Sequence, residues 1–459
     1  ALVLDITGSM SGSRITAMKA AAQDLVDLVV QDVQEPYYTR MSVVPYSIGV
    51  NMGSYANGAR GAPTQSTSIS GASWQVGSTT NISAITRANP GVVTANGHGL
   101  ANNDYVWISG VNGMTQVNSR IYRVTVVDSN RFQLKNAGTG ANWSTSGYSN
   151  YSSGGTEREC RVSDCSVVVT SNGHGMGNGE GVYITGVSGM SQINNTPFAI
   201  ANVTANTYSL GVNATSWGNY SSGGQSWCGR DGCQWRVFRN ISNNLRAHQI
   251  STCVTERTGA QAYTSAAPST AFVGRNYPAT SAPCPSAVIR PLSSDKAAMK
   301  SLISSFNVTG STAGHIGLAW GWYTVSPTFN PLWSGNPAGV ASPNELLKAV
   351  ILMTDGEFNT NYCTGVLASN AGIGGEKINC AATNGSPYDQ AEALCDAMKA
   401  EGVVVYTVGL ELTSGGAAED VMQYCATSPD HVYLPASGGD LSEAFAAIGR
   451  ELTQLRISR

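Results

Sequence analysis

Three oxygen-bearing side chains follow the first apolar run of the sequence at alternate positions. The run "LVL" ends at Asp5, and Thr7 and Ser9 follow it in "DITGSM". A later apolar run, "AVILMTD", ends at Asp355. Because ligands of an open parallel sheet bind at the carboxyl ends of its strands, we expect the two aspartates to lie at one edge of such a sheet.

The chemistry of these side chains favours a hard metal ion. A carboxylate and two hydroxyls on one loop suit Mg²⁺, Ca²⁺ or Mn²⁺ better than zinc, which prefers nitrogen and sulfur ligands. With few carboxylates of its own, such a site leaves the ion able to accept a carboxylate from a partner protein or surface ligand. The alternative is a helix-capping loop, because Asp, Ser and Thr are also favoured there. Asp355, a second acid at the end of another strand, favours the metal site over the capping loop.

The elements around these residues alternate between strand and helix. Apolar residues at helical spacing predict an amphipathic helix in "SRITAMKAAAQDLVDLVV", and "MSVVPY" predicts the next strand. Later segments predict a helix that begins at Pro387 and stops at Gly402, a strand in "VVVYTVGL" and a final helix around Phe445. Alternating helices and all-apolar strands predict a parallel sheet covered on both faces.

A repeated segment interrupts this pattern. "VVTANGHGLANNDYVWISGVNGMTQVN" reappears as "VVTSNGHGMGNGEGVYITGVSGMSQIN", and both copies continue to "YSSGG". Short strand-like runs between Gly and Asn turns predict two small β modules. We place the boundaries as follows: a core at 1–52 and 285–459, a linker at 53–79, modules at 80–160 and 161–228, and a disulfide-containing connector at 229–284.

The ten cysteines indicate an oxidising compartment. A short-range disulfide in each module is simpler than a zinc site, which would need ligands from two distant pairs. Cys395 lies on the later helix and Cys425 on the segment just before the final strand, so neighbouring elements could bring these two together. The four remaining cysteines then pair locally. The expected pairs are Cys160 with Cys165, Cys228 with Cys233, Cys395 with Cys425, Cys363 with Cys380, and Cys253 with Cys284.

Composition and missing motifs exclude several classes of function. Only 12% of the 459 residues are charged and the net charge is -3, without a basic stripe, so nucleic acid is not an expected partner. No apolar run is long enough for a bilayer. Because residue 1 already lies in a strand-like run, we expect an upstream segment, through which any membrane attachment would be made. Phosphate-loop, nucleophile-elbow and zinc-protease motifs are absent, so we do not expect an enzyme.

The motif at the first strand end resembles a known metal site. "DITGSM" is similar to the metal-ion-dependent adhesion site of von Willebrand factor A domains, whose pattern Asp-x-Ser-x-Ser is completed by a threonine and an aspartate on later loops. The resemblance implies a divalent cation held by the matching residues of this sequence, which are Asp5, Thr7, Ser9, Thr312 and Asp355.

A wider resemblance covers the opening stretch and nearly everything after residue 225. "CVTERTGAQAYTSAAP", "KAVILMTDGEFNT" and "LCDAMKAEGVVVYTVGL" resemble TadG-like proteins of bacterial Flp (Tad) pilus systems. This implies an α/β von Willebrand A core, which is a Rossmann-like, doubly wound, mostly parallel sheet. It also implies an extracellular or surface-exposed, periplasm-facing bacterial protein that serves adhesion or pilus assembly.

The repeats resemble the FCCH domain of ubiquitin-activating enzymes. The resemblance implies two small β-barrel-like modules inserted into the core, without ubiquitin chemistry, because the adenylation domain and the catalytic-cysteine context are missing. Such modules leave a second function open, that of a structural subunit or spacer of an extracellular filament joined by strand addition at exposed edges.

Two other kinds of residue could be mistaken for ligands. His98 and His174 recur in "NGHG" with no nearby acid or cysteine, so we interpret them as turn residues. Trp320 and Trp322 lie on an apolar helix and are expected in the core.

Overall fold

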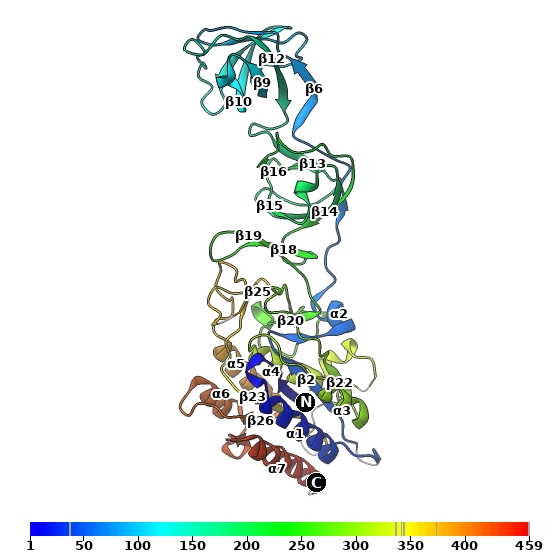
Figure 1. The fold of residues 1–459 in the computed structure, drawn as a ribbon. Coiled ribbons are helices and arrows are strands. Elements are labelled where there is room, and N and C mark those ends of the chain that lie inside the picture. Colours follow the sequence, from blue (N-terminus) through cyan, green and yellow to red (C-terminus); the bar gives the residue numbers. More distant parts are fainter. Residues whose placement is uncertain (36–37, 336, 341, 343–344, 373, 458–459) are drawn as a thin grey trace. The chain divides into compact units, whose positions relative to one another are not determined.

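A computed structural model describes residues 1–459 except 36–37, 336, 341, 343–344, 373 and 458–459. The chain divides into two compact units, coloured along the sequence in Figure 1. The core unit comprises Ala1–Pro63 and Phe238–Arg459, and the insertion unit comprises Thr64–Val237. Strand β18 (Trp235–Arg239) carries the chain across the second boundary. Each unit has its own clusters of buried apolar side chains.

The core unit is built on a mixed sheet of nine strands within the described residues. Five strands run parallel in the order β2–β1–β23–β26–β27. They are β1 (Leu2–Asp5), β2 (Met41–Tyr46), β23 (Ala349–Thr354), β26 (Val404–Gly409) and β27 (Val432–Tyr433). The antiparallel strands are β3 (Val50–Asn51), β20 (Cys253–Thr255), β21 (Gly274–Arg275) and β22 (Arg290–Ser293).

The predicted α/β core is confirmed, but the sheet is mixed where a mostly parallel one was expected. The antiparallel strands extend the sheet beyond β2, with β3 and β22 both pairing with it. They come from segments that flank the insertion, and they cover backbone groups that an edge strand would otherwise expose.

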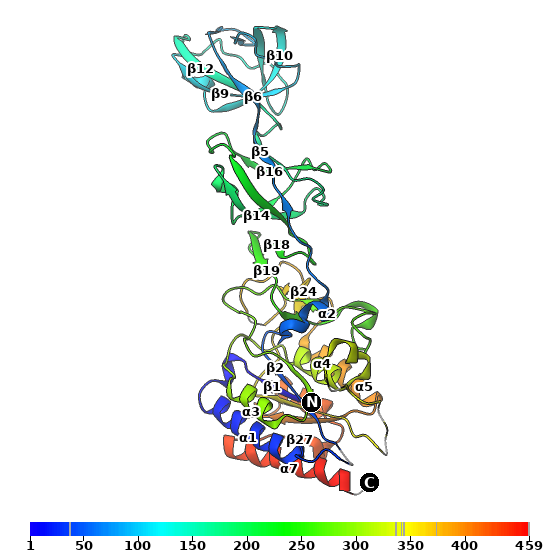
Figure 2. The same cartoon turned by 90° about the vertical axis from the view of Figure 1, so that its right-hand side faces the viewer.

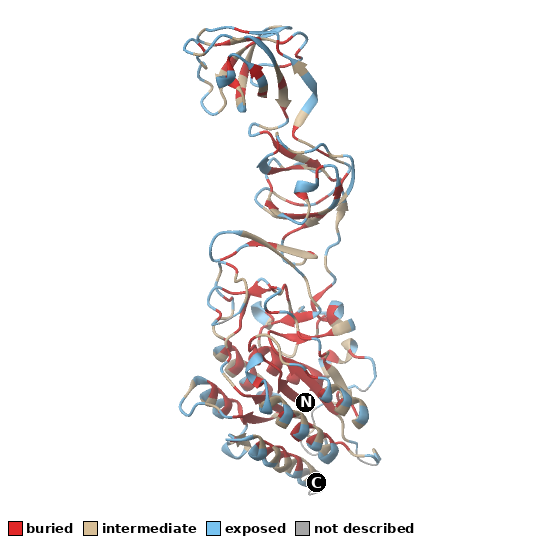
Figure 3. Cartoon of the chain, in the orientation of Figure 1, coloured by how far each residue is buried: buried red, intermediate tan, exposed pale blue. Residues whose placement is uncertain are grey.

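Helices cover both faces of this sheet, as Figure 2 shows. Alternate side chains of β1 belong to different cores: Leu2 and Leu4 pack with α1, α3 and α7, whereas Val3 packs with α4, α5 and α6. Strands β1 and β2 are buried throughout, and β23 and β26 are buried except at their first residues (Figure 3), which explains their mainly apolar sequences. The helices are α1 (Ser13–Val29), α3 (Lys296–Ser304), α4 (Gly314–Val325), α5 (Pro387–Ala400), α6 (Ala417–Cys425) and α7 (Gly438–Ile457).

The remaining short elements connect these layers. In the core unit they are α2 (Ala56–Arg60), β19 (Leu245–Gln249), β24 (Tyr362–Cys363), β25 (Val366–Leu367) and the 3₁₀ helices η1 (Gly8–Met10), η2 (Gly53–Tyr55), η5 (Gly259–Gln261), η6 (Pro327–Leu332) and η7 (Pro429–His431). Among the described residues, we find no helix with the length and hydropathy needed to cross a membrane.

The first module of the insertion unit, residues 75–160, forms a sheet in the order β6–β12–β9–β10–β11–β8–β7. Its strands are β6 (Gln75–Asn81), β7 (Ala84–Ile85), β8 (Val92–Thr94), β9 (Tyr105–Asn112), β10 (Arg120–Asp128), β11 (Arg131–Asn136) and β12 (Ser153–Cys160), with η3 (Thr115–Val117) between β9 and β10.

The second module takes its strands from two separate parts of the sequence. The later part supplies β13 (Ser166–Thr170), β14 (Gly181–Ser188), η4 (Ser191–Ile193), β15 (Pro197–Ala199), β16 (Thr207–Asn213) and β17 (Ser222–Cys228). The earlier part supplies β4 (Thr67–Ser68), which pairs with β17, and β5 (Gly71–Ser73), which pairs with β13.

These pairings nest one module inside the other. In the first module β6 pairs with β12 and β7 with β8, so β4 and β5 occupy in the second module the places of β6 and β7. The first module is thus inserted between β5 and β13 of the second. Residues 67–73 lie within the linker expected from sequence. They nevertheless complete the second module, whose other strands follow the first module in the sequence. Closure of either module into a barrel remains a prediction.

Five disulfides tie these elements together, and the described residues contain no free cysteine. They join the same cysteines as the pairs expected from sequence: Cys160–Cys165, Cys228–Cys233, Cys253–Cys284, Cys363–Cys380 and Cys395–Cys425.

Candidate functional site

Asp5 lies at the carboxyl end of β1, between two parallel neighbours. It is aligned with Tyr46 of β2, while Leu4 is aligned with Met353 of β23. Its side chain is buried, and its two oxygens accept hydrogen bonds from different elements. The Thr7 amide donates to Oδ1 over 2.8 Å, and the Thr354 hydroxyl donates to Oδ2 over 2.7 Å. The carboxylate is therefore held in one orientation at the edge of the sheet.

Ser9 connects this loop to the second aspartate. Its hydroxyl donates to Asp355 Oδ1 over 2.7 Å and lies 2.9 Å from the hydroxyl of Thr7. Hydrogen bonds therefore link Asp5 through Thr7 and Ser9 to Asp355, which brings four of the five predicted residues together.

Thr312, the fifth predicted residue, is reached through backbone contacts. Gly8 donates its amide to the carbonyl of Gly310 over 3.1 Å, and the Thr309 amide donates to the carbonyl of Ile6 over 2.9 Å. The segment that carries Thr312 thus lies against the Asp5–Ser9 loop. The Thr312 amide donates to Asn359 Oδ1 over 2.9 Å, but within the described residues no hydrogen bond joins its side chain to the other four.

Burial and charge alter the acidity of this site. Desolvation by burial, followed by the charge of Asp355, raises the pKa of Asp5 to about 6. Hydrogen bonds from Thr7 and Thr354 act in the opposite direction. Burial and the charge of Asp5 also raise the pKa of Tyr46, whose hydroxyl lies 3.4 Å from Asp5 Oδ2. Because two acids share one buried site, a nearby cation would stabilise their ionised forms.

The donors fit a hard divalent cation rather than zinc. The described residues contain no cluster of three or more His, Cys, Asp and Glu side chains that could hold a metal ion. The site instead combines two carboxylates with hydroxyl groups, which suit Mg²⁺, Ca²⁺ or Mn²⁺. The buried hydroxyl of Ser47, at the end of β2, has no hydrogen-bond partner among the described residues. Ser47 also contacts the Thr312 segment, because the Ala313 amide donates to its carbonyl over 2.8 Å.

Sequence reasoning missed two kinds of neighbour. Thr354 directly precedes Asp355 at the same strand end, and this position could have drawn attention to it. Arg14 lies in the first turn of α1 and donates to Asp355 Oδ2 over 2.9 Å. It also contacts Glu411, which follows β26. No sequence signal relates Arg14 to partners 341 and 397 residues away.

The recurring histidines of the two modules hold turns. Nδ1 of His98 accepts from the Leu100 amide over 3.0 Å, and Nδ1 of His174 accepts from the Met176 amide over 3.1 Å. Trp320 and Trp322 are buried in the core, as expected.

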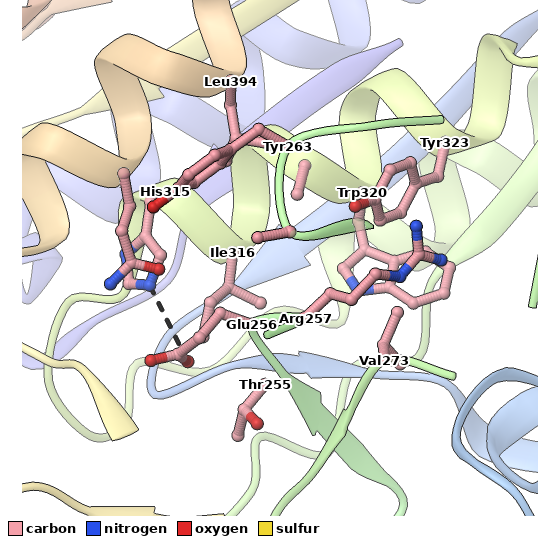
Figure 4. A pocket seen from close by; sticks show the side chains of 13 residues that line it. Thr255, Glu256, Arg257, Tyr263, Val273, His315, Ile316, Trp320, Tyr323 and Leu394 are labelled. Carbon is pink, nitrogen blue, oxygen red and sulfur yellow. Dashed lines mark ion pairs between the residues drawn. The ribbon is translucent and has the colours of Figure 1, made fainter. Parts of the chain in front are cut away.

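A second group of buried polar side chains lies beside α4 (Figure 4). His315 Nε2 and Glu256 Oε2 face one another over 3.8 Å, and neither has a hydrogen-bond partner among the described residues. The cavity beside them has a volume of about 10 Å³. That volume suits one water molecule and no organic ligand. The network around Asp5 is therefore the stronger candidate site.

Comparisons with known proteins match parts of the chain. The family model of the ubiquitin-activating enzyme E1 FCCH domain matches residues 88–161 and 165–227, which is less than half of the chain. The resemblance of the repeats to FCCH domains is thereby confirmed. No curated protein matches the chain.

Three solved structures show limited similarity. The pilus adhesin SpaC from Lactobacillus rhamnosus GG is 16% identical with a TM-score of 0.25, over 36% of this chain and 22% of that one. The vWF domain of the type V pili tip protein Mfa5 from Porphyromonas gingivalis is 15% identical with a TM-score of 0.27, and the match covers 36% of this chain and 75% of that domain's chain. Proximal thread matrix protein 1 from the mussel byssus is 22% identical with a TM-score of 0.23, and the match covers 35% of this chain and 33% of that one. The match thus spans about a fifth of the length of SpaC.

Proposed function

We propose that the core unit is a von Willebrand factor A-type domain that binds a divalent cation and, through it, a carboxylate of a protein or surface partner. The observation that carries this proposal is the hydrogen-bonded series from Asp5 to Asp355 at the carboxyl edge of the sheet. The proposed ligands are Asp5, Thr7, Ser9, Thr312 and Asp355.

The residues of the proposed site have different roles, some as ligands and others as groups that orient the ligands. Thr354 and the Thr7 amide orient Asp5, while Ser9 sets the position of Asp355. Hydroxyl ligands add no negative charge. A bound Mg²⁺, Ca²⁺ or Mn²⁺ would supply a Lewis-acidic centre with positive charge to spare for a partner's carboxylate.

The proposed setting is the surface of a bacterium, where the protein serves adhesion or the assembly of a Flp (Tad) pilus as a TadG-like protein. Five disulfides support an oxidising compartment outside the cytosol or facing the periplasm. The proposed activity is binding rather than catalysis.

A structural subunit or spacer of an extracellular filament is the second candidate. The insertion unit favours it, because two nested β modules carry edge strands such as β7 and β15 that another chain could extend. On this reading the core unit needs no metal ion for its role.

Titration calorimetry with Mg²⁺, Ca²⁺ and Mn²⁺ tests the proposal. We expect one cation per chain, and we expect Asp355→Asn to abolish its binding. Asp32→Asn is the matched control, because Asp32 is 87% exposed, pairs with Lys296 and should leave binding unchanged. Partners would then be screened among surfaces and pilus components with and without a chelator. Cation binding that survives Asp355→Asn, or partner binding that ignores the chelator, would favour the spacer.

A further inference from the structure

Arg14 places a positive charge directly on the candidate cation site. Its Nη1 donates to Asp355 Oδ2 over 2.9 Å and lies 3.4 Å from the carbonyl oxygen of Ser9. Ser9 already donates to Oδ1 of the same carboxylate. Both oxygens of Asp355 are thus engaged, one by a neutral hydroxyl and the other by a guanidinium.

Arg14 is also the more exposed member of this ion pair. The side chain of Asp355 is 0% exposed, whereas that of Arg14 is 31% exposed. Because a guanidinium stays protonated at any physiological pH, its charge is a constant feature of the site. An incoming cation therefore meets an occupied carboxylate.

Glu411 gives the same guanidinium a second anchor. Arg14 Nε and Nη2 lie 2.9 and 2.7 Å from Glu411 Oε2, so two of its nitrogens contact this acid and one contacts Asp355. Glu411 is itself held in place, since its amide donates to the carbonyl of Pro435 over 2.8 Å. Arg14 can release Asp355 and still keep an ion pair.

We propose that Arg14 is an internal counter-ion that competes with the divalent cation for Asp355 and moves wholly to Glu411 when the cation binds. This inference rests on the proposed function. A cation that coordinates Asp355 at roughly 2.0–2.6 Å lies too near the guanidinium charge for both to stay without strong repulsion. The competition lowers cation affinity, so that cation concentration regulates whether the site is ready for a partner.

The test compares the cation affinity of Arg14→Gln with that of Lys19→Gln. Both variants remove one positive charge from α1, but Lys19 donates to the carbonyl of Ser304 and, in the described part of the chain, has no hydrogen bond to the site. Mn²⁺ affinity is measured by calorimetry and by electron paramagnetic resonance at low and moderate salt. We expect Arg14→Gln to bind Mn²⁺ about ten-fold more tightly than the wild type, and Lys19→Gln to change affinity much less, because exposed charges are screened.

A double-mutant cycle tests the role of Glu411. If Glu411 acts by holding the displaced Arg14, then Glu411→Gln weakens cation binding in the wild type but has little effect in the Arg14→Gln background. Equal effects in both backgrounds would show a simple charge effect and overturn the proposed transfer of Arg14 to Glu411.

Failure of this inference is distinguishable from failure of the proposed function. If Arg14→Gln and Lys19→Gln bind Mn²⁺ with the same affinity, and Asp355→Asn abolishes that binding, the cation site stands and the counter-ion role of Arg14 is wrong. If neither the wild type nor Arg14→Gln binds a cation, both proposals are wrong. Binding by Arg14→Gln that is lost on adding Asp355→Asn, with weaker binding by the wild type, supports both.

Discussion

Tyr220 donates its hydroxyl to the carbonyl of Ile69, a residue 151 positions earlier in the chain, over 3.1 Å. The equivalent tyrosine of the first module, Tyr151, makes the same bond to Ile82 over 2.9 Å. Each tyrosine also bonds a glycine carbonyl three residues later, Gly223 or Gly154. Each copy of the repeat thus uses the same side chain to hold the residues between its first two strands, but the second copy takes these strands, β4 and β5, from before the first copy.

The nested arrangement predicts that the two modules differ in what can be removed. Deleting residues 74–164, with Cys165→Ser and a short Gly/Ser linker, keeps every strand of the second module. We expect this variant to unfold cooperatively in calorimetry. Replacing residues 67–73 by Gly/Ser removes two strands from the second module, and we expect its melting temperature to fall. A second module that is equally stable in both variants would show that β4 and β5 are dispensable.

The insertion unit as a whole should be removable from the core unit. Joining Pro63 to Phe238 through a short Gly/Ser linker keeps all strands of the core sheet and three disulfides. We expect a folded core that still binds the cation and has altered or lost partner selectivity. Circular dichroism and calorimetry would check both statements, and a core that fails to fold would disprove the independence of the two units.

Ser9→Ala should weaken cation binding without unfolding the core. The substitution removes the hydroxyl that joins Thr7 to Asp355. We expect cation affinity to fall about ten-fold, which corresponds to about 1.4 kcal/mol. Ser11→Ala is the control, because Ser11 is exposed and its amide, which the substitution keeps, donates to Gly8. Equal affinities of the two variants would remove Ser9 from the ligand set.

Glu157 should make the stability of the insertion unit depend on pH. Burial, followed by the charge of Glu159, raises the pKa of Glu157 from 4.5 to about 7. The folded state therefore binds this proton more tightly than the unfolded state, so stability falls as pH rises through this interval and then levels off. Glu157→Gln removes the dependence, and its advantage over the wild type should grow to at most about 3 kcal/mol above pH 7.

Calorimetry of both proteins between about pH 4.5 and pH 8 measures this difference. Glu180→Gln is the control, because Glu180 is partly exposed and pairs with Arg230 over 2.9 Å. An advantage of Glu157→Gln that stays constant across the range would contradict the prediction.

The disulfide between α5 and α6 should contribute more to stability than those of the modules. Cys395 and Cys425 are 30 positions apart in the sequence, whereas Cys160 and Cys165 are 5 apart. In the chain-entropy model the first bridge contributes about 3–4 kcal/mol and the second about 2 kcal/mol. Replacing each pair by alanine and measuring urea unfolding of its own unit would test the order. Equal losses would point to strain or residual structure instead.

Some of this architecture could be read from sequence because it follows from local signals. Asp5 and Asp355 each end an apolar run, and parallel strands bring their carboxyl ends to one edge. The helix after Pro387 is bounded by a proline and, at Gly402, by a residue with φ of 77°. Strands such as β4, with two residues, carry no periodicity. Their place is decided by backbone partners far along the chain.

The contacts of long side chains were the other feature that could not be predicted from the sequence. Arg14 is an ordinary helical residue in sequence, and its two acidic partners lie beyond the whole insertion. The packing of loops after β23 and β26 decides which carboxylates it reaches.

Nesting also affects how the protein withstands proteolysis. The first module is joined to the rest of the chain at two points, through residues 73–75 and through residues 160–166. The two connections lie side by side, because Gln75 pairs with Cys160 and the Arg161 amide donates to the carbonyl of Trp74 over 2.9 Å. A protease that cuts one connection leaves the module attached by the other, and a cut between Cys160 and Cys165 is also bridged by their disulfide. A module appended to the end of a chain would be released by a single cleavage, whereas release of this one requires a cut in each connection and, where the second cut falls between Cys160 and Cys165, reduction of their disulfide as well.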